Sequence, residues 1–175
     1  MLSSKIQSTV RNVPDFPKKG INFKDITPLF KDSSLVTEMA EVIASQFKNQ
    51  DINVVAGIES RGFLLGTMIA SILKVPFVPI RKKGKLPYKT ISEKYELEYG
   101  TAEIEMHIDA VESGDRVLVH DDLLATGGTA AATARLIEKA GGRVEGFSFI
   151  ISLDFLEGRK VLEQHSNNIQ SLTNY

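Results

Sequence analysis

The chain of 175 residues contains no cysteine, which excludes disulfides, thiolate catalysis and cysteine metal sites. Its three histidines, His107, His120 and His165, are too scattered for a metal-ligand spacing. The formal net charge of −1 implies no overall attraction to nucleic acid or to a membrane. No apolar run approaches the roughly 20 residues that cross a bilayer, and no apolar signal-peptide core follows Lys5. We therefore expect a soluble cytoplasmic protein with no nucleic-acid or membrane partner.

The chain is 42% hydrophobic, which suits one compact domain over residues 1–175. Apolar runs predict strands over 53–58, 76–80, 117–119, 144–153 and 169–175. Helical spacing and caps predict helices over 2–10, 33–49, 62–73, 130–140 and 154–164, with Ser33 or Ser34 capping the second. This alternation indicates an α/β fold with a mostly parallel, twisted sheet flanked by helices on both faces.

The stretch 117–129 combines an apolar strand, two acids, two glycines and the start of a helix. Asp121 and Asp122 follow the apolar run, at the strand end where open α/β sheets bind ligands. Gly127 and Gly128 permit close backbone approach, and Thr129 can cap the following helix. The free amides and dipole of such a helix favour a phosphate. The predicted phosphate loop consists of Ala125, Thr126, Gly127, Gly128 and Thr129.

Carboxylates aimed at a phosphate would repel it, so Asp121 and Asp122 must face sugar hydroxyls, a magnesium ion or both. The loop has neither the lysine of a P-loop nor the three spaced glycines of a dinucleotide site. The pattern therefore indicates a phosphorylated sugar. The alternative is an ordinary strand–helix turn with solvated aspartates.

The run Asp-Asp-Leu-Leu-Ala-Thr-Gly-Gly-Thr from Asp121 to Thr129 resembles the phosphoribosyl pyrophosphate signature of the type I phosphoribosyltransferases. Its form is most similar to that of the adenine-specific members. The resemblance covers residues from about 13 to 153, in four motifs in the expected order, and implies that fold. It also implies magnesium, bound near Asp121 and Asp122 through the substrate and water rather than by a direct side-chain cage.

A second strand–turn–helix unit carries Glu59, Ser60 and Arg61 before the helix over 62–73. An arginine beside a helix N-terminus can fork onto a phosphate, although a surface Arg–Glu pair is the alternative. The segment resembles the family's pyrophosphate loop, which implies that these residues bind pyrophosphate. The resemblance further implies a non-proline cis peptide here.

Four cations fall within residues 81–85, including Arg81, Lys82 and Lys85. A solvated basic turn and a weak nucleic-acid site are alternatives, but a pyrophosphate explains such a local focus of charge better. In the family these cations belong to the pyrophosphate end of the site. The residue matching Arg81 can reach a neighbouring subunit, which implies a homodimer.

The segment 14–29 holds Asn22, Phe23 and Lys24 within a loop rich in proline and glycine. From the residues alone, Phe23 is expected to pack in the core rather than to wall a planar-ligand pocket. The segment resembles the base-binding hood of adenine phosphoribosyltransferases, placed at about residues 1–30. That resemblance implies that Phe23 stacks on adenine while the backbone on either side, at Asn22 and Lys24, reads its amine edge. Family members often have arginine at the position of Lys24.

The polar segment 88–100 is a candidate lid, and the alternation around it predicts a hairpin. It resembles the family's flexible catalytic loop, placed at about 82–100, in which the residue matching Glu98 is the acid or base. Glu96, Glu103 and Glu105 are its local competitors.

Together these motifs imply transfer of a phosphoribosyl group to adenine, giving AMP and pyrophosphate. Transfer to hypoxanthine, guanine or xanthine, and a non-catalytic protein of the same fold, are the alternatives. His120, at the end of a buried strand, is expected to be a packed structural residue.

Overall fold

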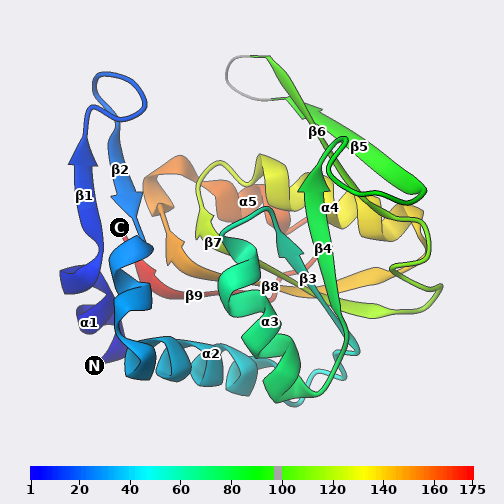
Figure 1. The fold of residues 1–175 in the computed structure, drawn as a ribbon, viewed down its shortest axis with the longest axis horizontal. Helices are drawn as coiled ribbons and strands as arrows, with labels where there is room; N and C mark the ends of the chain where they lie inside the picture. Colours follow the sequence, from blue (N-terminus) through cyan, green and yellow to red (C-terminus); the bar gives the residue numbers. More distant parts are fainter. Residues whose placement is uncertain (97–99) are drawn as a thin grey trace.

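A computed structural model describes residues 1–96 and 100–175 of the chain (Figure 1). A seven-stranded sheet has the order β5-β6-β4-β3-β7-β8-β9. Its strands are β3 (Val54–Ile58), β4 (Phe77–Lys82), β5 (Thr90–Glu96), β6 (Thr101–His107), β7 (Arg116–Leu124), β8 (Arg143–Ser152) and β9 (Ile169–Asn174). The five strands from β4 to β9 in this order are parallel, whereas β5 and β6 form an antiparallel hairpin at one edge. The predicted mostly parallel α/β sheet is confirmed.

Two apolar layers cover the sheet because successive strand residues face opposite sides. In β3, Val54, Ala56 and Ile58 join the core under α4 (Gly128–Lys139) and α5 (Gly158–Leu162). Val55 joins the other core, with α1 (Leu2–Thr9), α2 (Ser33–Phe47) and α3 (Gly62–Leu73). The continuous apolar runs of the sequence reflect this burial on both faces.

Two helix boundaries differ from the sequence-based expectation. The cap of α2 is Asp32, whose Oδ1 accepts the amides of Ser34 at 3.0 Å and Leu35 at 3.1 Å. The helix expected over 154–164 is divided into a short 3₁₀ turn, η2 (Asp154–Leu156), and α5. The interruption lies at Glu157, which has a positive φ of 54° that no α-helix accommodates.

The N-terminal loop is more regular than expected. Strands β1 (Arg11–Pro14) and β2 (Asn22–Asp25) form a separate antiparallel hairpin that stands beside the main sheet, followed by η1 (Thr27–Lys31) (Figure 1). Within the described ranges, no helix is long and apolar enough to span a membrane.

Candidate active site

The residues of the predicted phosphate loop form the turn between β7 and α4. Gly127 has a φ of +82°, and α4 starts at Gly128, so Thr129 lies inside the helix and does not cap it as expected. Within the part of the chain that the structure describes, no side chain caps the N-terminus of α4, which leaves its first amides available to an anion. A hollow of about 80 Å³ lies here, lined by residues 121, 123–130 and Phe149.

The two aspartates lie inside β7, which continues to Leu124, and not beyond its end as expected. As strand neighbours they face opposite sides: Asp121 lines the hollow of the phosphate loop, and Asp122 faces Arg61. Burial, followed by the nearby charge of Asp122, raises the pKa of Asp121 well above its usual value. Oδ1 of Asp121 also accepts the backbone amide of Asp122 at 2.8 Å, so the two acids are neighbours between the phosphate loop and Arg61.

Arg61 contacts residues from two other elements, Asp122 of β7 and Phe23 of β2. Its Nε lies 3.0 Å from Oδ2 of Asp122, a residue that is only 3% exposed. Its guanidinium carbon lies 5.3 Å from the ring centroid of Phe23. The expected alternative, a surface Arg–Glu pair, is therefore wrong, because the partner is a buried aspartate. The Arg61 contact does not have hydrogen-bond geometry, and within the described part of the chain Oδ2 of Asp122 has no hydrogen-bond donor.

Glu59 binds the cations of the site with its side chain. Its two oxygens accept hydrogen bonds from Nη2 and Nε of Arg81, at 3.2 and 3.3 Å, and Oε2 also accepts the Lys82 amide at 2.7 Å. Burial alone raises the pKa of Glu59, but the hydrogen bonds from Lys82 and Arg81 lower it below its usual value. With this carboxylate engaged, contact with an anion is left to the backbone of 59–61 and to Ser60 and Arg61. The expected cis peptide between Glu59 and Ser60 is present.

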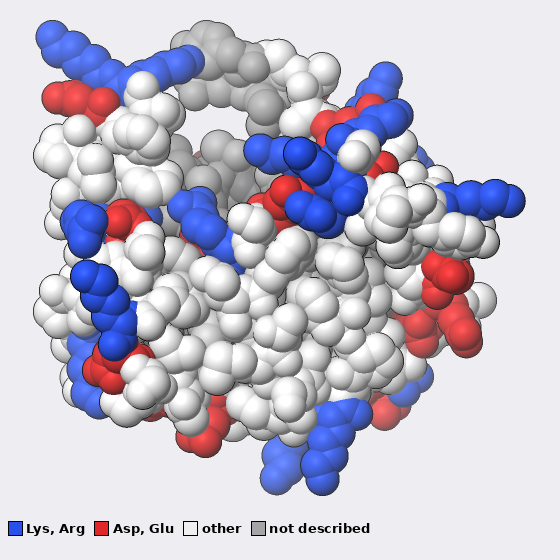
Figure 2. Space-filling view, in the orientation of Figure 1, with Lys and Arg blue, Asp and Glu red and all other residues white. Residues whose placement is uncertain are grey.

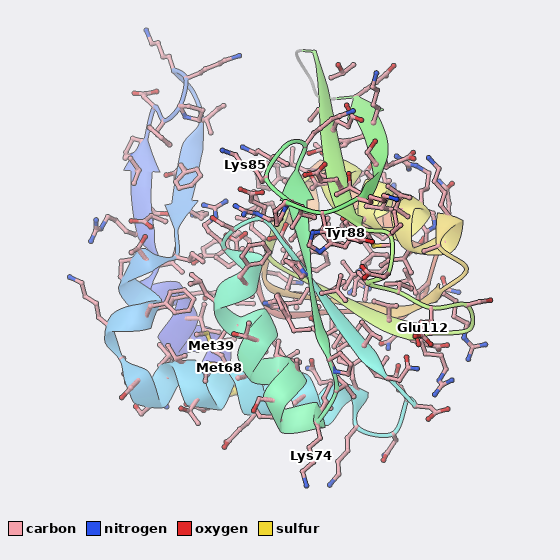
Figure 3. All side chains as sticks on the ribbon, turned by 45° about the vertical axis from the view of Figure 1, so that its right-hand side comes forward. Met39, Met68, Lys74, Lys85, Tyr88 and Glu112 are labelled. Atoms are coloured by element: carbon pink, nitrogen blue, oxygen red, sulfur yellow. The ribbon has the colours of Figure 1, made fainter. Side chains whose placement is uncertain are left out.

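Glu105 holds the turn that carries Lys85. It is 3% exposed, and its Oε1 accepts the amides of Lys85 and Leu86, both at 3.0 Å. Figure 3 shows Lys85 and Tyr88 on the segment between β4 and β5, near the end of the sheet where α3 begins, and Lys74 at the opposite end of α3. Sequence reasoning missed this role and treated Glu105 as a competitor of Glu98; the signal was a glutamate between the buried residues Ile104 and Met106.

The other acids of the hairpin differ in availability. Glu103 accepts hydrogen bonds from Lys83 and Ser92, both at 2.6 Å, so its carboxylate is engaged. Glu96 is exposed at the end of β5. Glu98 lies outside the described residues.

The hairpin of β5 and β6 packs on the phosphate loop. Oγ1 of Thr129 donates to the hydroxyl of Tyr95 at 3.2 Å. Further along α4, Glu93 forms ion pairs with Arg135, at 2.8 Å, and with Lys139. The strand that leads toward residue 98 is therefore held against the phosphate end of the site.

Phe23 lies in the N-terminal hairpin and belongs to neither core, so the expectation of core packing is wrong. Its ring meets Phe16 edge to face at 5.2 Å, and a hollow of about 270 Å³ is lined by Val13, Phe16, Phe23 and Asp25. Beside it, Nζ of Lys24 contacts Oδ1 of Asn12 at 2.6 Å and lies 4.0 Å from the ring centroid of Tyr175. Asn22 is exposed at the start of β2.

His120 is fully buried, and its Nδ1 lies 2.9 Å from Oγ of Ser148. Burial lowers its pKa to about 4, so the ring is neutral at pH 7. The expectation of a packed structural histidine is confirmed.

Comparisons with known proteins agree with this geometry. The family described as phosphoribosyl transferase domain matches residues 27–173. The adenine phosphoribosyltransferase of Cytophaga hutchinsonii is 53% identical over 175 residues, which cover 100% of this chain and 97% of that protein. The chain belongs to the adenine phosphoribosyltransferase family.

Solved structures of the family have the same fold. The crystal structure from Rhodothermus marinus has a TM-score of 0.93 and 53% identity, covering 99% of this chain and 98% of that one. The Saccharomyces cerevisiae structure, complexed with an imino-altritol bisphosphate and adenine, has a TM-score of 0.90 and 35% identity, with 98% of both chains covered. The general domain begins at Thr27, whereas the adenine phosphoribosyltransferase match extends over the hairpin of β1 and β2.

Proposed function

We propose that this protein transfers the phosphoribosyl group of phosphoribosyl pyrophosphate to adenine, giving AMP and pyrophosphate for purine salvage. The observation that carries the proposal is the position of Arg61, between Asp122 of β7 and Phe23 of the N-terminal hairpin. It joins a sugar-phosphate site and an aromatic base site into one continuous surface.

The 5′-phosphate is assigned to the loop 125–129 and the open amides of α4. The ribose hydroxyls are assigned to Asp121 and Asp122. Oδ2 of Asp122 is a buried acceptor without a hydrogen-bond donor among the described residues, and a ribose hydroxyl supplies one. Asp121 also lines the hollow of the phosphate loop, but its raised pKa weakens the repulsion of a phosphate bound there.

The pyrophosphate is assigned to the backbone of 59–61 and to Ser60, Arg61, Arg81, Lys82 and Lys85. Magnesium fits beside Asp121 and Asp122 through water and substrate oxygens. Among the described residues no group of three or more acids or histidines forms a metal cage, and Mg²⁺ usually keeps several waters in nucleotide sites. When bound, the ion neutralises charge on the leaving pyrophosphate.

The reaction breaks the bond between the anomeric carbon and pyrophosphate and forms one to a nitrogen of the adenine five-membered ring. Negative charge develops on the leaving group, where Arg61 and the 81–85 cations stabilise it. On the basis of the family resemblance, we assign to Glu98 the transfer of the proton on the five-membered ring of adenine. Closure of the 82–100 segment excludes water, which would compete for the same carbon.

The base is assigned to Phe23, with the backbone of Asn22 and Lys24 reading its amine edge. The half-buried ring of Phe23 and the adjoining hollow support stacking of a planar base. The hairpin lies outside the general domain match, so it is the part of this chain suited to base choice.

The protein is proposed to act as a homodimer in the cytoplasm. Leu64 and Ile72, 48% and 43% exposed, lie on one stripe of α3 with Met68 between them. Figure 2 shows a broad area without charged side chains across the centre of the face on which α3 lies. An uncharged area that includes the exposed apolar side chains of α3, close to the 81–85 cations, suits a second copy of the chain.

The test is pyrophosphate release from phosphoribosyl pyrophosphate and magnesium with adenine, hypoxanthine, guanine or xanthine supplied in turn. We expect release with adenine alone. Release with another purine in place of adenine would assign a different base. No release with any base would support the non-catalytic alternative.

A further inference from the structure

A backbone contact from outside the site supports the phosphate loop. Gly158, buried at the start of α5, lies against residues 125–127, and α4 and α5 cover the same face of the sheet (Figure 1). A Cβ at position 158 would lie 2.2 Å from the carbonyl oxygen of Ala125 and 2.9 Å from the amide nitrogen of Gly127. A Cβ at Gly127 would in turn lie 2.7 Å from the carbonyl oxygen of Gly158. The two backbones therefore pack against each other with no room for a side chain on either.

Helix α5 is held in place on its other sides. Leu162 is 0% exposed in the core, and Nη2 of Arg159 donates to the carbonyl of Ile169 at 2.7 Å. The preceding segment is tied to β7, because the Leu153 amide donates to the carbonyl of Leu124 at 2.9 Å. Among the described residues, the loop 125–127 has fewer such anchors than α5, so an added atom at 158 displaces the loop rather than the helix.

We propose that Gly158 is a positioning residue for the 5′-phosphate, with α5 acting as the floor that fixes the path of residues 125–127. It acts through the loop amides and does not touch the ligand. The proposal rests on the proposed function, because it assumes that these amides bind the phosphate of AMP and of phosphoribosyl pyrophosphate. It assigns a role to residue 158, beyond the stretch on which the sequence resemblance rests.

Gly146 offers a matched control. A Cβ there would lie 2.5 Å from Cε1 of Phe47 and 2.9 Å from the carbonyl oxygen of Asn168, so Gly146 also has no room for a side chain, although its nearest contact is less close than the 2.2 Å at Gly158. It pairs with Leu118 near the start of β7, at the opposite end of the strand from the phosphate loop. Alanine at either glycine disturbs packing, but only one of them adjoins the phosphate loop.

The experiment compares Gly158→Ala with Gly146→Ala by calorimetric titration with AMP and with adenosine, which lacks the phosphate. We expect Gly158→Ala to lower the affinity for AMP about tenfold, which is equivalent to the loss of one charge-assisted amide hydrogen bond. The affinity for adenosine should be unchanged. The KM of this variant for phosphoribosyl pyrophosphate should rise while its KM for adenine stays constant. Gly146→Ala should lower Tm and leave the ratio of AMP to adenosine affinity at the wild-type value.

A wild-type ratio in Gly158→Ala would overturn the proposal. If that variant does not fold, Leu162→Val replaces it in the experiment. This substitution loosens the packing of α5 in the core without adding an atom at position 158. A selective loss of AMP affinity of about twofold or more supports the proposal, and an unchanged ratio overturns it. A wild-type protein that binds AMP no more tightly than adenosine would contradict the proposed function itself. If the wild-type protein binds AMP more tightly than adenosine and Gly158→Ala keeps the same affinity ratio, only the role of residue 158 is contradicted.

Discussion

The turn after β7 and the turn after β3 both lead from a buried strand into a helix, but they are built from different groups. The first is uncharged, with Gly127 at the N-cap of α4 and the backbone of Gly158 behind it. The second has Arg61 at the N-cap of α3, with its charge already paired to Asp122. A phosphate can enter the first without breaking a side-chain contact, whereas a pyrophosphate at the second must draw Arg61 from its carboxylate.

The buried residues beneath the two turns also differ in polarity. Behind the phosphate loop lie apolar residues such as Phe149 and Leu162. On the α3 side of β7 lies His120, paired with Ser148 and close to Gly66. The phosphate end is therefore built mainly from backbone groups, whereas the pyrophosphate end contains the charged side chains of Arg61 and Asp122.

The largest expected effect is on the chemical step, and it should leave ligand binding at both turns unchanged. Glu98→Gln should lower kcat about 10²–10⁴-fold, because it removes a positioned acid or base, while the affinities for AMP and pyrophosphate stay unchanged. Single-turnover kinetics and calorimetry measure the two quantities, with Glu96→Gln as the neighbouring control. Unchanged turnover would mean that another group handles the proton.

The next effect is on the pH dependence of stability, through His120, which is buried beneath α3. The folded pKa of His120 is about 4, against 6.5 for an ordinary histidine, so between these values the unfolded chain binds more protons. The free energy of unfolding should therefore fall as pH drops from 6.5 to 4, by about 3 kcal/mol for this residue. Denaturation of wild type and His120→Val in metal-free buffer at several pH values isolates the contribution. Parallel pH profiles for the two proteins would contradict it.

Arg61→Ala should lower the affinity for pyrophosphate about 10- to 100-fold, because it removes a charged hydrogen-bond donor. AMP should lose much less affinity, since its phosphate binds at the other turn. Titration of the variant with each ligand in magnesium gives the comparison, and Gly158→Ala should show the reverse preference. Equal losses of both ligands in Arg61→Ala would indicate a general structural role.

The smallest effect is at the base. Phe23→Leu should weaken adenine about 2- to 12-fold, the equivalent of losing an aromatic stack of about 0.5–1.5 kcal/mol. Pyrophosphate binding should be unchanged in the same variant. Phe155→Leu is the control, because Phe155 is 72% exposed and does not line the hollow beside Phe23. Similar adenine affinity in all three proteins would remove Phe23 from the base site.

The sequence was informative where one local pattern determines the outcome. Continuous apolar runs located β3, β4, β7 and β8 because both faces of these strands are covered. Alternation over 101–108 located β6, the second strand of the predicted hairpin, and the glycines located the turn between β7 and α4. The short apolar run at 117–119 also placed the two acids close to the end of β7.

The parts that could not be predicted depend on contacts between distant segments. The ion pair of Arg61 with Asp122, the anchoring of Lys85 by Glu105 and the packing of Gly158 on Gly127 join residues from separate elements. Phe23 was expected in the core because its local pattern is apolar, but the hairpin that carries it stands beside the main sheet. Helix boundaries at Asp32 and Glu157 were decided by single side-chain and backbone conformations.

The most direct test of this account is a crystal structure of the protein with AMP, magnesium and pyrophosphate. The account predicts the 5′-phosphate on the amides of 126–129, pyrophosphate on the 59–61 turn, and Arg61 moved from Asp122 onto the pyrophosphate. An AMP phosphate bound at the 59–61 turn, or Arg61 still paired with Asp122 beside a bound pyrophosphate, would contradict it.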